Sequence, residues 1–277
     1  MSAGEFLRRG LRFIIKGIPN NVVKVGISYT QPNGRLRDQK IIVTGGGRGL
    51  GFAMTKKFIA EGAKVLITGR NEETLRKASE ETGCHYILYD ICDTESSGNF
   101  ILNAAEILGG IDCLVNNAGI SLHEPTFFDV TPESFSRQLK TNLEGPFFLT
   151  QAFIQYLKDK QSGGNIIFIS SETGDTADCR PYGYTKAAVN SMVRGLAHLF
   201  KEKNIRINAV APGITASSMT GVGSTDNLHA SGYGAGRFYL PEEVAEVASF
   251  LLSPESGCIS GQIITCNNAQ TINARWK

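Results

Sequence analysis

Along the chain from Lys40, short apolar runs rich in Val and Ile alternate with segments of helical periodicity. The apolar runs predict seven strands, at residues 40–44, 64–68, 84–89, 111–116, 165–170, 205–210 and 262–266. The segments between them predict six helices, at residues 50–61, 72–81, 94–108, 132–158, 182–201 and 241–252. Such alternation is typical of a parallel sheet that helices cover on both faces. We therefore expect an α/β fold with a doubly wound, seven-stranded parallel sheet and a ligand site at the carboxyl ends of its strands.

The size and composition of the chain limit its organisation. With 277 residues, 42% hydrophobic and 19% charged, it is long enough for a sizeable core but short for two catalytic domains. We expect a basic N-terminal arm over residues 1–37 and one catalytic domain over residues 38–277. The net charge of +2 gives no reason to expect a nucleic-acid partner. The six cysteines show no CxxC spacing, so we expect reduced thiols, no metal site and a cytoplasmic location.

The arm is basic, and apolar residues between Leu7 and Ile18 would share one face of a helix beside arginines. No apolar run in the chain is long enough to cross a bilayer. Two interpretations remain open. Residues 1–20 either make a peripheral contact with a membrane surface or pack on this protein or a neighbouring subunit, and we favour packing.

A second unusual segment is the glycine-rich stretch at residues 220–237, which has no periodicity. It follows shortly after a predicted strand end, where a ligand site is expected. This position favours a mobile substrate loop over a plain surface excursion.

The first predicted strand runs directly into the sequence GGGRGLG and then into a helix. A tight glycine turn lets backbone N–H groups approach a pyrophosphate, and the positive end of the helix dipole adds to the attraction. The segment does not fit G-x-G-x-x-G or a Walker A loop, but residues 44–51 match T-G-x-x-x-G-x-G. A purely structural turn is the alternative. The candidate cofactor contacts are Gly45, Gly47, Arg48, Gly49, Leu50 and Gly51.

The second predicted strand indicates which dinucleotide binds. It ends in Ile-Thr-Gly-Arg at residues 67–70, without the carboxylate that would accept hydrogen bonds from the adenosine ribose. Arg48 and Arg70 can instead hold a 2′-phosphate, because guanidinium geometry suits phosphate oxygens. The sequence thus predicts NADP(H) in preference to NAD(H), unless both arginines are only solvated surface charges.

Three side chains carry the predicted chemistry. Tyr182 and Lys186 are four residues apart on a predicted helix and share one face. An adjacent ammonium lowers the pKa of a phenol, which makes it a better acid or base at neutral pH. The strand at residues 165–170 ends in Ser170 and Ser171 at the same edge of the sheet. A serine, a tyrosine and a lysine can hold and protonate a carbonyl oxygen while hydride arrives at its carbon.

The order and spacing of these motifs resemble the short-chain dehydrogenase/reductase family over residues 36–272, in particular its ketoacyl-carrier-protein reductases. The motifs are residues 44–51, 116–119, Asn142, Ser171, Tyr182 with Lys186, and residues 212–213. The resemblance implies a Rossmann-type fold and an NADP(H)-dependent enzyme that interconverts a carbonyl and a secondary alcohol. It also implies a small-molecule substrate and a homo-oligomer, either a dimer or a tetramer.

The resemblance further implies a role for each residue. Tyr182 would be the general acid or base, Lys186 would lower its pKa and bind the nicotinamide ribose, and Ser171 would orient the substrate oxygen. Asn142 would help to hold Lys186 and a proton-relay water. The other implied cofactor contacts are Asp90 and Ile91 at the adenine, Asn117, Ala118 and Gly119 in the cleft, and Pro212, Gly213, Thr215 and Ser217 near the nicotinamide carboxamide.

The chain departs from the family in the loop before the tyrosine. Tyr182 follows Ser171 at a shorter interval than is usual, and the usual interval would reach Tyr184. Tyr184 has Ala188 four residues later instead of a lysine, so it is the weaker candidate. Ser170 is likewise an alternative to Ser171.

A second departure lies at residues 266–269, where the chain has Cys-Asn-Asn-Ala and many relatives have Asp-Gly-Gly. This difference puts the usual packing of the carboxyl terminus in doubt. For the chain as a whole, the alternative function is a catalytically silent cofactor-binding regulator or a membrane-surface protein on the same fold.

Overall fold

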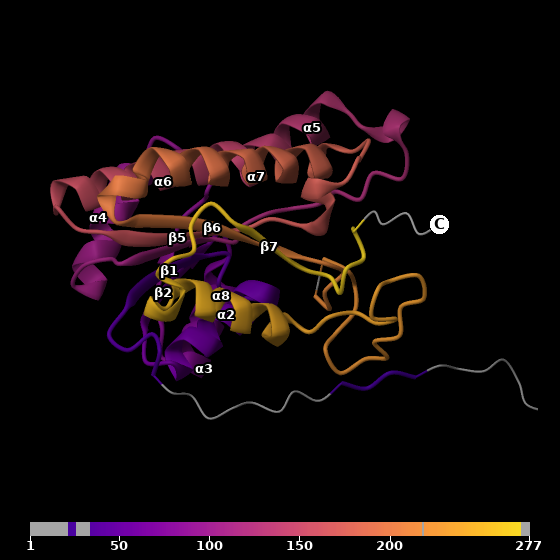
Figure 1. Cartoon of the computed structure of the whole chain (residues 1–277), viewed down its shortest axis with the longest axis horizontal. Coiled ribbons are helices and arrows are strands. Elements are labelled where there is room, and N and C mark those ends of the chain that lie inside the picture. Colours follow the sequence, from indigo (N-terminus) through magenta and orange to yellow (C-terminus); the bar gives the residue numbers. More distant parts are fainter. Residues whose placement is uncertain (1–21, 26–33, 218, 273–277) are drawn as a thin grey trace, which may run out of the picture.

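The computed structural model describes residues 22–25, 34–217 and 219–272, and seven strands of these residues form one parallel sheet (Figure 1). The strand order is β3-β2-β1-β4-β5-β6-β7. The strands are β1 (Lys40–Thr44), β2 (Lys64–Gly69), β3 (His85–Leu88), β4 (Cys113–Asn116), β5 (Gly164–Ile169), β6 (Ile205–Pro212) and β7 (Ile263–Cys266). The chain winds outward from β1 to β3 and then returns to the other side of β1 with β4. This doubly wound order confirms the expected fold and opens a crevice between the carboxyl ends of β1 and β4.

Two layers of helices cover the sheet (Figure 1). The helices on one face are α2 (Gly49–Ala60), α3 (Glu72–Thr82) and α8 (Pro241–Leu252). Those on the other are α4 (Ser97–Leu108), α5 (Pro132–Leu139), α6 (Gly145–Asp159) and α7 (Pro181–Phe200). The predicted strands and helices are thus found in order, with ends that differ by a few residues.

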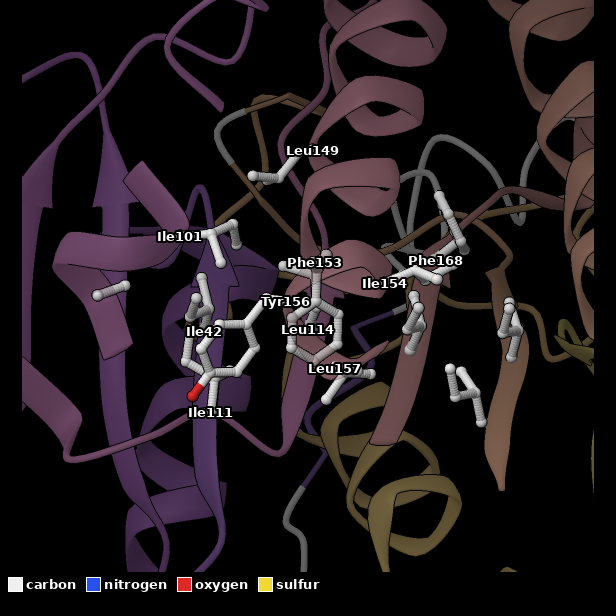
Figure 2. Packing of buried hydrophobic residues seen from close by; sticks show 14 of the residues in the cluster. Ile42, Ile101, Ile111, Leu114, Leu149, Phe153, Ile154, Tyr156, Leu157 and Phe168 are labelled. Atoms are coloured by element: carbon white, nitrogen blue, oxygen red, sulfur yellow. The ribbon is translucent and has the colours of Figure 1, made fainter. Parts of the chain in front are cut away.

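Each face of the sheet has its own core because successive side chains of a strand point to opposite faces. In β1, Ile42 packs under α4 and α6, whereas its two neighbours pack under α2 and α8. Figure 2 shows Phe153 and Leu157 of α6 beside Leu114 of β4, with Leu149 farther along the same helix. This packing fixes the height of α6, and of the segment that precedes it, above the sheet.

The helix predicted at residues 132–158 is confirmed in its extent, but it is not α-helical throughout. The structure has α5, then a π-helical turn at Lys140–Glu144, and then α6. Pro146 lies at the start of α6 and has no N–H to donate to the carbonyl of Asn142, four residues earlier. The widened turn places Asn142 in a buried position, and such turns occur often at functional sites.

Part of the N-terminal arm contacts the glycine-rich loop. Val23 accepts a hydrogen bond from the backbone N–H of Leu228 at 3.1 Å, and Val25 packs against Leu228 and Leu240. Leu36, also assigned to the arm, is fully buried. Residues 1–20, for which packing was favoured over a peripheral membrane contact, lie outside the described residues. The described helices include none long and apolar enough to span a membrane.

The buried position of Phe153 generates a stability prediction. Phe153→Ala should lower the free energy of unfolding by about 3–5 kcal/mol, because it removes buried apolar surface and leaves a cavity. Urea denaturation followed by circular dichroism measures this change. Phe128, which is 92% exposed, provides the control: Phe128→Ala should cost less than about 1 kcal/mol. Equal losses in the two variants would contradict the described core.

Candidate active site

The turn between β1 and α2 has the geometry of a pyrophosphate site. Gly45 and Gly49 have φ values of 66° and 52°, in the left-handed region that favours glycine. A Cβ on Gly51 would overlap the carbonyl of Gly45, so the helix can approach the turn only with glycine there. Arg48 caps α2 without a side-chain hydrogen bond to the first helical N–H groups. These groups and the helix dipole are therefore available to an anion, and the turn fits a dinucleotide.

Thr44 and Asn117 fix this turn to the end of β4. The Thr44 hydroxyl accepts hydrogen bonds from the N–H groups of Asn117 and Ala118 at 3.0 and 2.9 Å. The Asn117 amide in turn donates to the carbonyls of Thr44 and Gly45 at 2.9 and 3.2 Å. Thr44 belongs to the turn motif but was not predicted as a site residue. Its hydroxyl holds the two sides of the crevice together.

Arg48 and Arg70 lie at neighbouring points of the carboxyl edge. Thr44 at the end of β1 is paired with Thr68 of β2, and each strand is followed within four residues by one of the arginines. Both arginines are exposed, and among the described residues neither forms an ion pair. Two unpaired guanidinium groups at one corner are suited to a phosphate.

Of the two residues expected to contact the adenine, one lies at the edge of the sheet and the other lies in the core. Asp90 is half-buried beyond the end of β3, and its carboxylate accepts a hydrogen bond from the N–H of Cys92 at 3.0 Å. Ile91 is buried in the core, and a Cβ on Gly145 would overlap its carbonyl. Asp90 is therefore better placed than Ile91 to meet a ligand at the edge.

Ser171, Tyr182 and Lys186 lie together where β5 ends and α7 begins. The Lys186 Nζ lies 5.5 Å from the centre of the Tyr182 ring and donates to the carbonyl of Ile169 at 2.8 Å. The Ser171 hydroxyl lies near enough to the Tyr182 phenol to lower its pKa. The structure thus brings together three of the four predicted catalytic side chains, and their roles stay predictions.

Burial controls the pKa values of this group. It lowers the pKa of Lys186 to about 8, because a buried ammonium loses its hydration. It also raises the pKa of the Tyr182 phenol, and the nearby Ser171 hydroxyl only partly opposes that rise. The phenol is therefore protonated at neutral pH. The lowering of its pKa that is expected from Lys186 stays a prediction.

The alternative residues are turned away from the group. Tyr184 is 46% exposed, and it lies two positions after Tyr182, about 200° around the helix from it. Ser170 is buried, and its hydroxyl donates to Asn190 of α7 at 2.6 Å. The structure therefore favours Tyr182 and Ser171 as the reactive pair.

Asn142 lies beside Lys186 and is held by two other contacts. Its side-chain amide exchanges hydrogen bonds with the backbone of Ile120, each at 2.8 Å, and also donates to Thr185 at 3.2 Å. A Cβ on Gly119 would lie 3.4 Å from the Asn142 carbonyl oxygen and 3.8 Å from the Lys186 Nζ. Asn142 and Lys186 therefore line the same small space at Gly119. Thr185 was not predicted, and its only sequence signal is its position beside Lys186.

The segment at residues 212–217 brings the end of β6 to the glycine turn. A Cβ on Gly49 would lie 3.8 Å from the Cβ of Ser217. Thr220, which the sequence analysis did not single out, fixes this segment by accepting from the Ser217 N–H at 3.1 Å and donating to the Thr215 carbonyl at 2.9 Å. Pro212 and Thr215 are buried, so the segment offers its backbone and Ser217 to a ligand.

A hollow of about 490 Å³ opens where this segment faces the start of α2. Its lining includes Gly49, Phe52, Lys56, Ser217, Val222 and Glu242. The first part of the glycine-rich loop therefore forms one wall of a cavity at the glycine turn. This position agrees with the expectation of a substrate loop, whose movement stays a prediction.

Comparison with known proteins identifies similar chains. Residues 39–227 match the family model for short chain dehydrogenases. A 3alpha-hydroxysteroid dehydrogenase of Mediterraneibacter gnavus is 36% identical over 84% of this chain and 97% of its own length. A 3-oxoacyl acyl-carrier-protein reductase of Aquifex aeolicus is 33% identical over the same shares. A crystal structure of a candidate short-chain alcohol dehydrogenase from Sinorhizobium meliloti superposes with a TM-score of 0.76 at 30% identity, over 88% of this chain and all of the other.

The low pKa of Lys186 generates a prediction about stability and pH. Between about pH 8 and its ordinary pKa of 10.5, this lysine binds a proton in the unfolded chain but not in the folded protein, so wild-type stability rises with pH there. Lys186→Met removes this dependence. The stability of the variant relative to wild type should fall by about 2–3 kcal/mol between pH 7 and pH 10.

Urea denaturation at a series of pH values measures the difference. Lys160→Met, at an exposed lysine after α6, corrects for the loss of a surface charge. A difference between Lys186→Met and wild type that stays constant from pH 7 to pH 10 would contradict the lowered pKa.

Proposed function

Because the chain belongs to the short-chain dehydrogenase family and is an oxidoreductase, we propose that it interconverts a carbonyl and a secondary alcohol with NADP(H). The observation that carries this proposal is the meeting of Ser171, Tyr182 and Lys186 beside the glycine turn. Bound there, the nicotinamide would supply or accept the hydride. The substrate would be a small molecule, since the names of similar proteins include hydroxysteroid and 3-oxoacyl substrates.

The cofactor would lie along the edge of the sheet at which the strands have their carboxyl ends. The turn at residues 45–51 and the first N–H groups of α2 bind the pyrophosphate, and Asn117, Ala118 and Gly119 form the opposite wall. Arg48 and Arg70 bind the 2′-phosphate, which distinguishes NADP(H) from NAD(H). The segment at residues 212–217 meets the nicotinamide end.

Ser171, Tyr182 and Lys186 would act on the carbonyl oxygen of the substrate and on the proton that it gains or loses. Ser171 donates a hydrogen bond to the carbonyl oxygen of the substrate, and Tyr182 gives that oxygen a proton in reduction. The phenol is protonated at neutral pH and can therefore donate this proton at the outset. The Lys186 ammonium then stabilises the phenolate. Asn142 lines the same small space as Lys186, and a proton can return to the phenolate through this space. In oxidation, the phenolate takes the proton from the alcohol.

We also propose that the chain forms a homo-oligomer, as a dimer or a tetramer. Phe147 and Phe148 on α6 and Leu199 on α7 leave apolar side chains exposed. Large apolar groups on neighbouring helices are common at such interfaces. A second subunit would then pack against α7, the helix that carries Tyr182 and Lys186.

The proton donor can be tested by removing one oxygen atom. Tyr182→Phe should lower kcat for the reduction of any accepted ketone by at least about 100-fold, because no acid remains at the carbonyl oxygen. NADPH binding, measured by fluorescence titration, should stay near the wild-type value. Tyr184→Phe, the same change at the exposed neighbour, should retain activity. Turnover by Tyr182→Phe, or its loss in Tyr184→Phe, would overturn the assignment.

The choice of cofactor can be tested at Arg70. Arg70→Ala should weaken NADPH binding by about tenfold or more, because a charge-assisted hydrogen bond to the 2′-phosphate is lost. NADH binding should change little, since that cofactor lacks this phosphate. Arg76→Ala is the control, because Arg76 is exposed on α3 and pairs with Glu80 at 2.6 Å. An equal loss for NADPH and NADH on Arg70→Ala would contradict the 2′-phosphate site.

A further inference from the structure

Asn267, the first residue after β7, connects the carboxyl-terminal turn to the serine loop. It is 3% exposed, and its side-chain amide donates to the Glu172 carboxylate and to the Thr271 hydroxyl, each at 2.9 Å. Glu172 immediately follows Ser171 and begins the 3-10 turn Glu172–Asp175. A buried side chain from the far end of the sequence therefore holds the residue next to the serine that would orient the substrate.

The turn after Asn267 keeps the backbone shape expected for Asp-Gly-Gly. Asn268 and Ala269, which stand at the two glycine positions, have φ values of 50° and 63°. Glycine adopts such values freely, asparagine does so more readily than most residues, and alanine does so at a cost. The departure seen in the sequence thus leaves the turn intact. What it changes is the first side chain, from a carboxylate to an amide.

The presence of Glu172 explains why an amide is more favourable than a carboxylate at position 267. A carboxylate at position 267 would face the Glu172 carboxylate across a hydrogen-bond distance, where two negative charges repel. Among the described residues Glu172 forms no ion pair, and Arg237, which lies over the Tyr239 ring, is already paired with Glu243 at 2.7 Å. The amide N–H of Asn267 instead donates to Glu172.

Asn267 also contacts the segment that would meet the nicotinamide. A Cβ on Gly213 would lie 2.9 Å from the Asn267 Cβ, and the Gly213 N–H donates to the Cys266 carbonyl at 2.9 Å. Asn267 therefore lies between the Pro-Gly segment on one side and the serine loop on the other. In the proposed function, the first segment would meet the nicotinamide and the second carries the serine that would orient the substrate oxygen.

We propose that Asn267 is a positioning residue that holds Ser171, through Glu172, at the correct place relative to the nicotinamide end of the cofactor. This inference rests on the proposed oxidoreductase function. Asn267 acts through Glu172 and touches neither the substrate nor the reacting atoms. A small displacement of a catalytic group is enough to slow a reaction strongly.

The test is Asn267→Asp, which adds no bulk and restores the residue that many relatives have. At neutral pH the two carboxylates repel, and kcat for ketone reduction should fall at least about tenfold. As the pH falls, one of the pair binds a proton and can donate again, so activity relative to wild type should recover. The Kd for NADPH should stay near the wild-type value. A merely structural role would not produce this pH profile together with an unchanged Kd.

The double variant Glu172→Gln with Asn267→Asp reverses donor and acceptor. The glutamine amide can donate to the new aspartate, so kcat at neutral pH should return towards wild type. Asn268→Asp adds the same charge one residue later, at an exposed side chain, and should keep the wild-type pH profile. A wild-type profile in Asn267→Asp, or no rescue in the double variant, would overturn the inference. No turnover of any ketone by the wild-type chain would overturn the proposed function itself.

Discussion

The parallel register of β1, β4, β5 and β6 is the constraint on which the site depends. Hydrogen bonds between these strands bring their carboxyl ends to one edge, so residues far apart in the sequence become neighbours. The glycine turn follows β1, Asn117 follows β4, and Ser171 follows β5. Interactions between residues close in sequence could not assemble these groups, because they follow strands that are far apart along the chain. The cores above and below the sheet maintain this register and thereby maintain the site.

The chemistry of the edge is governed by burial. The fold removes Lys186 from water and lowers its pKa to about 8, while it raises the pKa of the neighbouring phenol. Both effects favour the uncharged forms, so the lysine lowers the stability of the protein below pH 8. A protein that gained only stability from this position would place an apolar side chain there. The buried lysine is therefore more easily understood as part of a reactive group.

Much of this could be predicted from sequence because the signals are local. Apolar runs and glycine spacing located the strands and the turn, and the spacing of Tyr182 and Lys186 located the reactive face of α7. The π-helical turn at Asn142 was missed, although Pro146 carried the signal. The burial that raises the pKa of Tyr182 comes from distant segments, so no local pattern could predict it. The contact between Asn267 and Glu172 joins residues from the middle and the carboxyl-terminal end of the domain, and no local pattern reveals such a pair.

The central claim is that a dinucleotide lies along this edge with its reactive end at Tyr182. A crystal structure of the protein with NADP+ tests it most directly. We expect the 2′-phosphate between the guanidinium groups of Arg48 and Arg70, the pyrophosphate on the glycine turn, and the nicotinamide ring facing the Tyr182 hydroxyl. A dinucleotide bound elsewhere, or a nicotinamide ring remote from Tyr182, would contradict the account.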